Sequence, residues 1–236
     1  MINLDCMKKV YYIAVMAVSA LMCTSCSDMN SLHDPYLKDG ETIYLAKFDS
    51  VSVHSGNRRV MVEYWLSDPK AKQCLVEWNL GYDKATLPIT LSEGDTPNVF
   101  YLNDLDETTL SFSFTSCSED LKYTSLKTNS TCIVYGEKYI ATLMNATVKS
   151  AKYDSKKNNV TIIWTSNYEG VVGYSVKYKD TSGVERVVRC PVDTKDRIAV
   201  LADFPQDGSF SYAAVYLPTE GAVDEFMPEY VTYTVK

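Results

Sequence analysis

The chain has 236 residues, and its 30 acidic side chains outnumber 23 basic ones, which gives a formal charge of −7. Its hydrophobic share of 46% and aromatic share of 12% allow a substantial core, so disorder is excluded as the main description. The chain lacks the Lys/Arg excess that displaces counterions from a phosphate backbone, and we therefore predict no nucleic-acid partner. The length corresponds to one or two domains of roughly 100 to 150 residues.

Residues 1–25 have the features of a signal peptide. Two lysines precede an apolar run over 10–22, which is shorter than the roughly 20 residues of a membrane-spanning helix. Small residues stand directly before Cys26, as a signal peptidase requires. The pattern resembles a bacterial lipoprotein signal, which implies diacylation of Cys26. A plain secretory signal and a single anchor helix are the alternatives, and Met7 is an alternative start.

Residues 26–42 are polar and are predicted to form a flexible tether. Two acyl chains hold a protein stably on a membrane, whereas one chain binds only marginally, so the lipid is the expected membrane contact. An acidic residue, Asp28, lies close behind Cys26, and this resembles lipoproteins of Bacteroidetes that reach the outside of the cell. The expected location is therefore the outer membrane, with the cell surface favoured over the periplasmic face.

From Ala46 onward, apolar residues recur at alternate positions, and turn-forming residues interrupt them about every eight to twelve residues. The clearest segments are 60–64, 110–114, 160–164, 172–178, 210–216 and 231–235. This pattern predicts an all-β protein made of two tandem sandwiches of about 100 residues each, immunoglobulin-like or fibronectin type III-like.

A short helical linker is predicted between the two halves. Tyr139, Ile140, Leu143 and Met144 have helical spacing, and Asn145 is a candidate cap at the end of the helix. The predicted domains are a first sandwich over 43–136, the linker over 137–147 and a second sandwich over 148–236.

Several segments carry resemblances to known families. In the second half, Trp164 and the segment VGYSVKY at 172–178 resemble the second and third strands of fibronectin type III domains. Over the mature chain, the segments CSDMN at 26–30, YLKDGE at 36–41, WLSDPK at 65–70, VYGEKY at 134–139 and YLP at 216–218 resemble a family of uncharacterised Bacteroidetes outer-membrane lipoproteins. That resemblance implies a setting near polysaccharide-utilisation genes and supplies no established activity.

The usual catalytic signatures are absent from the sequence, which has no GxSxG elbow, phosphate-binding glycine loop, HExxH motif or paired CxxC. Of the two histidines, His54 has no nucleophile motif around it. Two acidic clusters could flank a glycosidic bond or hold calcium, although each is more simply a polar turn: Asp104, Asp106 and Glu107, and Glu220, Asp224 and Glu225. We predict no enzyme, no cofactor and no metal, with a carboxylate-dependent glycosidase as the least favoured function.

Four cysteines follow the signal region, at 74, 117, 132 and 190. Disulfides can form in an oxidising envelope, and Cys117 and Cys132 flank one hairpin-like connection, so they are the favoured pair. Buried free thiols that act as small apolar side chains are the competing interpretation.

One short motif points to a covalent modification. Asp49-Ser50-Val51 resembles the O-glycosylation sequon of Bacteroidetes envelope proteins, which makes Ser50 a candidate site.

Aromatic side chains are the remaining candidates for binding. The chain has 18 Tyr and 3 Trp, and sugar rings stack on aromatic faces while carboxylates bind their hydroxyls. Trp164 alternates with apolar residues and is predicted to be buried. The predicted ligand-binding set is Asp224, Glu225, Phe226 and Tyr230, in the long loop after Tyr216.

Together, these features favour a non-enzymatic accessory or interaction module of an outer-membrane glycan-uptake system, with a glycan or an outer-membrane protein as partner. Direct carbohydrate binding is the alternative. An interaction module predicts an exposed apolar patch or an open sheet edge, whereas a glycan binder predicts an exposed aromatic ring beside polar groups.

Overall fold

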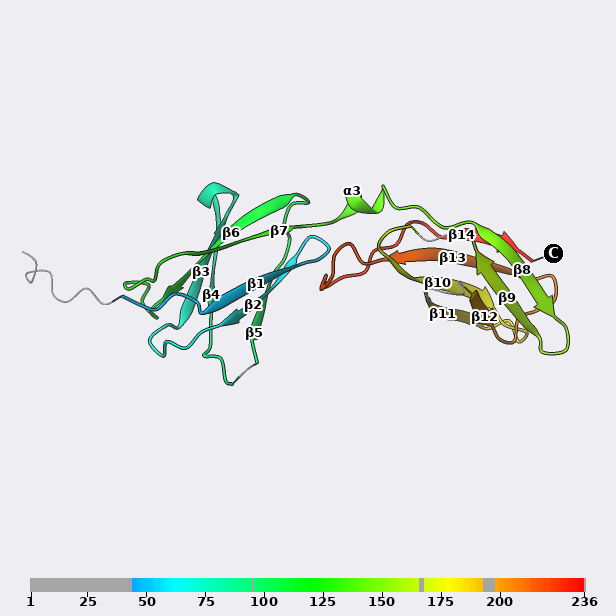
Figure 1. Ribbon diagram of the computed structural model, residues 1–236, viewed down its shortest axis with the longest axis horizontal. Helices are drawn as coiled ribbons and strands as arrows, with labels where there is room; N and C mark the ends of the chain where they lie inside the picture. Colours follow the sequence, from blue (N-terminus) through cyan, green and yellow to red (C-terminus); the bar gives the residue numbers. More distant parts are fainter. Residues whose placement is uncertain (1–43, 95, 166–167, 193–197, 236) are drawn as a thin grey trace, which may run out of the picture. The chain divides into compact units, whose positions relative to one another are not determined.

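The computed structural model describes residues 44–94, 96–165, 168–192 and 198–235. Residues Leu45–Lys236 form one compact unit. The predicted signal peptide, Cys26 and the tether lie outside the described residues. This unit contains all of the sheets described below (Figure 1).

The first sandwich packs a three-stranded sheet against a four-stranded one (Figure 1). The three-stranded sheet has the order β1 (Ser50–Ser55), β2 (Val60–Trp65) and β5 (Asn98–Leu102). The four-stranded sheet has the order β4 (Asp83–Pro88), β3 (Gln73–Trp78), β6 (Thr109–Cys117) and β7 (Thr128–Ile133). A short 3-10 helix, η1 (Asn79–Gly81), joins β3 to β4.

Strand alternation forms the core of this sandwich. In β2, Val60, Val62 and Tyr64 are buried, while Met61 and the other intervening residues are partly exposed. Successive side chains of a strand point to opposite faces, so one face of β2 is buried against the facing sheet. The buried face packs with aromatic residues of β6, Phe112 and Phe114.

The second sandwich repeats the same strand order. Its three-stranded sheet has the order β12 (Ile198–Leu201), β9 (Asn159–Trp164) and β8 (Val148–Asp154). Its four-stranded sheet has the order β11 (Glu185–Pro191), β10 (Val171–Lys179), β13 (Ser209–Tyr216) and β14 (Val231–Thr234). Both sandwiches thus pair their first, second and fifth strands in one sheet, which confirms the predicted tandem β-sandwich fold.

Trp164 lies at the centre of the second core, as predicted. Its ring stacks on Tyr174 of the facing sheet, with ring centroids 4.0 Å apart and planes 4° apart. Val160 and Ile162, four and two residues before it in β9, are also fully buried. The alternation of β9 therefore holds over its whole apolar face.

The segment between the sandwiches contains a shorter helix than the one predicted over 137–147. Helix α3 spans only Glu137–Ile140. Asn145 does not cap it, because its Oδ1 accepts a hydrogen bond from the Ala214 N–H at 2.7 Å and its Nδ2 donates to the Glu229 carbonyl at 2.7 Å. These contacts attach the end of the linker to the second sandwich, and they replace the helical capping role predicted for Asn145.

Candidate functional site

The loop after β13, predicted to bind a ligand, folds back onto its own strand. Tyr216 and Phe226 exchange two backbone hydrogen bonds of 2.8 and 2.9 Å, so residues 217–225 form a loop whose two ends are paired. Within this loop, the Val223 N–H donates a hydrogen bond of 2.7 Å to the carbonyl of Ser55, at the end of β1. The loop therefore connects the second sandwich to the first.

Phe226 is 2% exposed and cannot stack on a sugar ring, so its predicted ligand role is wrong. Its ring makes edge contacts with Tyr135 and Tyr139, at centroid distances of 5.9 and 5.2 Å. Tyr135 and Tyr139 also pack on each other at 4.6 Å. The three rings form an aromatic cluster between the linker and the loop, because burial of such large apolar surfaces is favourable.

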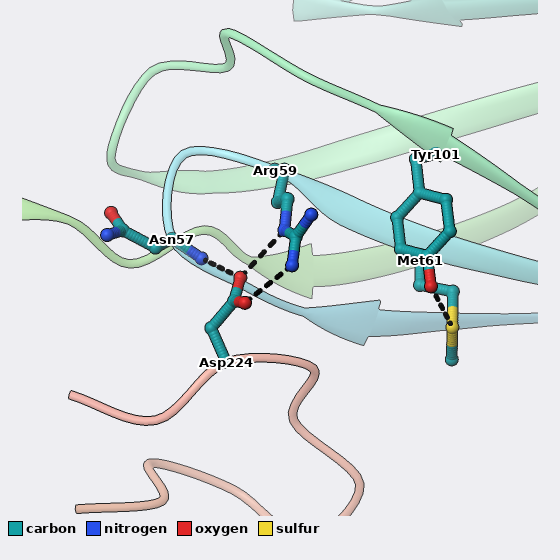
Figure 2. Close-up of polar contacts among 5 residues, drawn as sticks. All are labelled: Asn57, Arg59, Met61, Tyr101 and Asp224. Carbon is teal, nitrogen blue, oxygen red and sulfur yellow. Dashed lines mark hydrogen bonds and ion pairs between the residues drawn. The ribbon is translucent and has the colours of Figure 1, made fainter.

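Asp224 is likewise occupied by protein contacts, which corrects its predicted role in ligand binding. Figure 2 shows its carboxylate facing Arg59 and the backbone of Asn57. Arg59 Nε donates to Oδ2 at 2.8 Å and Nη2 donates to Oδ1 at 2.6 Å, while the Asn57 N–H donates to Oδ2 at 2.9 Å. The hydrogen bonds from Arg59 lower the pKa of Asp224 below the ordinary value of 3.8.

Two glycines permit this close approach. A Cβ on Gly56 would lie 2.7 Å from Asp224 Oδ2 and 3.0 Å from the Arg59 carbonyl. Gly221 has a φ of +77°, and a Cβ there would lie 3.2 Å from the His54 ring. A side chain at position 56 would therefore clash with Asp224, and one at position 221 would crowd His54 and strain the backbone.

The linker side of the contact is fixed by Glu107. Its two carboxylate oxygens accept hydrogen bonds from the backbone N–H groups of Lys138 and Tyr139, at 2.7 and 2.6 Å. These N–H groups belong to the first turn of α3, where the helix itself supplies no acceptors. We use the term joint for this assembly of Arg59, Asp224, the aromatic cluster and Glu107.

The other two residues of the predicted ligand set lie on the outer face of the second sandwich. Glu225 forms an ion pair with Arg189 of β11 at 2.7 Å. The hydroxyls of Tyr230 and Ser175 lie 2.8 Å apart, and the Lys177 ammonium lies 4.0 Å from the centroid of the Tyr230 ring. A groove of about 580 Å³ opens beside Tyr230. Tyr230 thus remains a candidate for ligand binding.

Two of the candidate catalytic groups, His54 and Glu107, are paired with other groups of the protein. His54 pairs with Glu63 at 3.1 Å on the outer face of the first sandwich. Glu107 caps α3, and Asp104 has a φ of +56° in a turn. Among the described residues, no group of three or more His, Cys, Asp or Glu side chains is arranged to hold a metal ion.

The predicted disulfide between Cys117 and Cys132 is contradicted by the strand register. Cys132 lies opposite Leu110 in the β6–β7 ladder, seven residues along β6 from Cys117. At about 3.3 Å per residue the separation is roughly 23 Å, whereas a disulfide needs Cα atoms within about 7 Å. All four described cysteines are buried free thiols, and burial raises the pKa of Cys74 to about 12.

Two predicted modification sites stay predictions. Ser50 is exposed at the first position of β1, and Cys26 lies outside the described residues. In the part of the chain that the structure describes, no helix combines the length and apolar character needed to cross a bilayer.

A strained apolar tip joins β3 to β4. Asn79, Leu80 and Gly81 all have positive φ angles, of 50°, 58° and 85°. Leu80 is 97% exposed and Tyr82 is 84% exposed. We use the term apolar tip for Leu80 and Tyr82.

The two features that the sequence reasoning missed are the pairing of Arg59 and the apolar tip. Arg59 pairs with a residue 165 positions away, and no local pattern identifies such a partner. The tip carried a local signal, since the segment Asn79-Leu80-Gly81-Tyr82 places turn-forming residues beside apolar ones.

Residues 26–226 match the family DUF4998, a domain of unknown function. Among solved structures, the chain is similar to the FN1–FN3 domains of chicken CNTN1, with 12% identity, coverage of 84% of this chain and 67% of that chain, and a TM-score of 0.45. It is also similar to a segment of two fibronectin type III domains from chicken tenascin, with 16% identity, coverage of 82% and 99%, and a TM-score of 0.29. No curated protein matches the chain.

Proposed function

We propose that this chain, which belongs to the DUF4998 family, is a non-catalytic interaction module of the bacterial envelope that works beside a glycan-uptake system. In this proposal a lipid on Cys26 holds it on the outer membrane, and the two sandwiches present a binding surface to a protein partner. The N-terminal sequence, which resembles a lipoprotein signal, and the two tandem sandwiches support the proposal.

The apolar tip is the observation that carries the proposal. A left-handed backbone costs roughly 1–2 kcal/mol for a residue with a side chain, and Leu80 adopts it while almost its whole side chain faces solvent. The positive φ angles form the hairpin turn between β3 and β4, but the exposed Leu80 side chain adds nothing to the core. Strained residues persist where they serve a function, and exposed Leu and Tyr side chains suit an apolar pocket on a protein partner.

The joint supports the same function, because it connects the sandwiches through several kinds of contact. The loop after β13 supplies an ion pair to Arg59, a backbone hydrogen bond to Ser55 and the Phe226 ring. A partner that binds one sandwich is thereby connected, through the joint, to the other sandwich. This arrangement suits a spacer or assembly role better than catalysis.

Cross-linking in intact cells tests the proposed function. A photo-reactive amino acid at position 82 is compared with the same residue at position 156, an exposed site in the turn between β8 and β9. We expect a discrete adduct from position 82, and we expect Leu80→Asp to abolish it. Equal patterns from both positions, or an adduct that survives Leu80→Asp, would contradict the role of the apolar tip.

The location has its own test. We expect Cys26→Ser to move the protein from the membrane fraction to the soluble fraction, since the diacyl anchor would no longer be attached. Protease treatment of intact cells then separates the cell surface from the periplasmic face, because only a surface protein is degraded. Unchanged membrane association of Cys26→Ser would exclude the lipid anchor.

A further inference from the structure

The groove beside Tyr230 lies on the outer face of the four-stranded sheet of the second sandwich. Along β10, Val176 and Tyr178 point into the core, so the alternate residues Lys177 and Lys179 point outward. The groove has a volume of about 580 Å³, and its polar lining consists of Lys177, Lys179, Glu185, Ser209, Ser211 and Tyr230. Figure 1 labels β10, β11 and β13, which carry the lysines, the glutamate and the serines. It also labels β14, which begins directly after Tyr230.

The aromatic ring of the groove is held in place before any ligand binds. The Tyr230 hydroxyl lies 2.8 Å from Ser175 Oγ, and the ring lies 4.0 Å from Lys177 Nζ. The side chain still remains partly exposed. A group that pairs with Lys177 therefore lies beside the tyrosine ring, where the rest of a bound sugar can contact it.

The charge of the groove is opposite to that of the chain. Two lysines and one glutamate line it, whereas the whole chain has a formal charge of −7. Among the described residues, Arg59, Arg186 and Arg189 each form an ion pair with a carboxylate. Neither Lys177 nor Lys179 takes part in any of these ion pairs. Glu185 lies across from Lys179 in the β10–β11 ladder, so the two lysines leave the lining with a net positive charge, and a ligand anion can pair with them.

The remaining lining distinguishes a sugar from a simple anion. Ser209 and Ser211 of β13 present hydroxyls to the groove, and Ser211 Oγ lies 2.8 Å from Thr232 Oγ1. Hydroxyl groups both donate and accept hydrogen bonds, which matches the hydroxyls of a saccharide. An inorganic anion would use the lysines and leave the tyrosine ring without a role.

We infer that this groove binds an acidic saccharide, a sugar that carries a carboxylate or a sulfate group. Lys177 and Lys179 pair with the anion, Tyr230 contacts the sugar ring, and the serines bind its hydroxyls. This inference goes beyond the proposed function, which requires no ligand in the groove.

Titration of the full chain in a nonionic detergent, with affinity electrophoresis as a second readout, tests the inference. The probes are oligogalacturonate, the same oligomer as its methyl ester, sulfated dextran oligomers and neutral dextran oligomers. We expect binding of at least one charged probe, tenfold or more weaker binding of its neutral counterpart, and weakening by salt. The two charged probes distinguish a carboxylate from a sulfate. Equal affinity for charged and neutral probes, or no binding of any probe, would overturn the inference.

Single substitutions locate the site. Lys177→Gln and Lys179→Gln are each expected to weaken binding about tenfold, since a hydrogen bond to a charged group is lost. Glu185→Gln is expected to tighten binding, because it removes the one carboxylate that lines the groove. Lys156→Gln, in the exposed turn after β8, is the matched control for nonspecific attraction. An equal loss from Lys156→Gln would overturn the inference.

The role of the ring is tested by Tyr230→Phe and Tyr230→Ala. Tyr230→Phe keeps the ring and removes the hydroxyl, so it should bind more tightly than Tyr230→Ala. Thermal unfolding of each variant confirms that the fold is retained. Equal binding by the wild type and Tyr230→Ala would exclude a contact with the ring. None of these outcomes changes the cross-link expected at position 82, so the two proposals fail separately.

Discussion

The ion pair between Arg59 and Asp224 is expected to stabilise the joint by about 1 kcal/mol. The perturbation is a double-mutant cycle of Arg59→Gln, Asp224→Asn and the double variant. Asp224→Asn removes the charge but keeps an oxygen that can still accept the hydrogen bond from the Asn57 N–H, now 2.9 Å away. The coupling energy therefore isolates the interaction between the two side chains.

The magnitude follows from the geometry and the exposure of the pair. Two unit charges about 4 Å apart attract by roughly 4 kcal/mol at an effective dielectric constant near 20. Desolvation and the ordering of two side chains offset most of this attraction, and the side chains are 38% and 22% exposed. Exposed pairs measure about 0.2–1 kcal/mol, and the two-point contact of Arg59 on the carboxylate favours the upper end.

Urea unfolding followed by tryptophan fluorescence measures the cycle, because urea does not screen charges. The pair between Arg189 and Glu225 is the matched comparison in the same loop. It has a single contact of 2.7 Å, and its side chains are 39% and 53% exposed, so its coupling should be close to zero. A coupling for Arg59 and Asp224 no larger than that for Arg189 and Glu225 would refute the reasoning.

The same pair predicts a dependence of stability on pH. Arg59 holds the pKa of Asp224 below its ordinary value of 3.8 in the folded protein. A lowered pKa means that the stabilisation is fully present above the unfolded value and is lost as the pH falls through the folded value. The difference in unfolding free energy between the wild type and Asp224→Asn should therefore be constant near neutral pH and shrink below about pH 4. A difference that grows on acidification would contradict this assignment.

Three further predictions concern tightly packed positions and a buried thiol. Phe226→Ala should lower the free energy of unfolding by about 3–5 kcal/mol, because it leaves a cavity beside Tyr139. This loss should exceed that from removing the ion pair, and urea unfolding of both variants decides which contact contributes more to the joint. Gly56→Ala should cost about 1–3 kcal/mol in the same assay, since its Cβ would lie 2.7 Å from Asp224 Oδ2, and an unchanged midpoint would refute this close approach. Cys74 should resist iodoacetamide in the native protein, because burial raises its pKa to about 12, and should react in urea without reductant; a need for reductant would indicate a disulfide.

Local alternation explains why the strands could be predicted from the sequence. In β2 and β9 every second residue is apolar and buried, because each strand has one face toward the facing sheet. The same rule predicted the burial of Trp164. The helix over 137–147 was overpredicted, because the apolar spacing there reflects contacts with the second sandwich. Asn145 illustrates this, since its side chain binds the backbones of Ala214 and Glu229.

Nonlocal pairing explains the errors at the candidate site. An acidic and aromatic loop has the same composition whether it binds a sugar or a neighbouring domain, and only the position of Arg59 decides between them. The cysteine pair failed for a related reason. Proximity was judged from the connection between Cys117 and Cys132, whereas the register places Cys132 opposite Leu110.

The loop after β13 performs two structural tasks, and its residues divide between them. Asp224 and Phe226 belong to the joint. Glu225 and Tyr230 contact the outer face of the second sandwich, where Glu225 pairs with Arg189 and Tyr230 contacts Ser175. Ala213 and Val215 lie on that same outer face of β13 by alternation, yet both are buried.

An outward strand face becomes buried only when another segment covers it, and the contacts of Glu225 and Tyr230 identify this segment as 225–230. The cover ends at Tyr230, where the groove with its two outward lysines begins. The Tyr230 ring, which the sequence predicted to bind a ligand, is therefore positioned by the same segment that contains the buried Phe226. Its availability to a ligand depends on where that segment stops, which no pattern in the loop itself encodes.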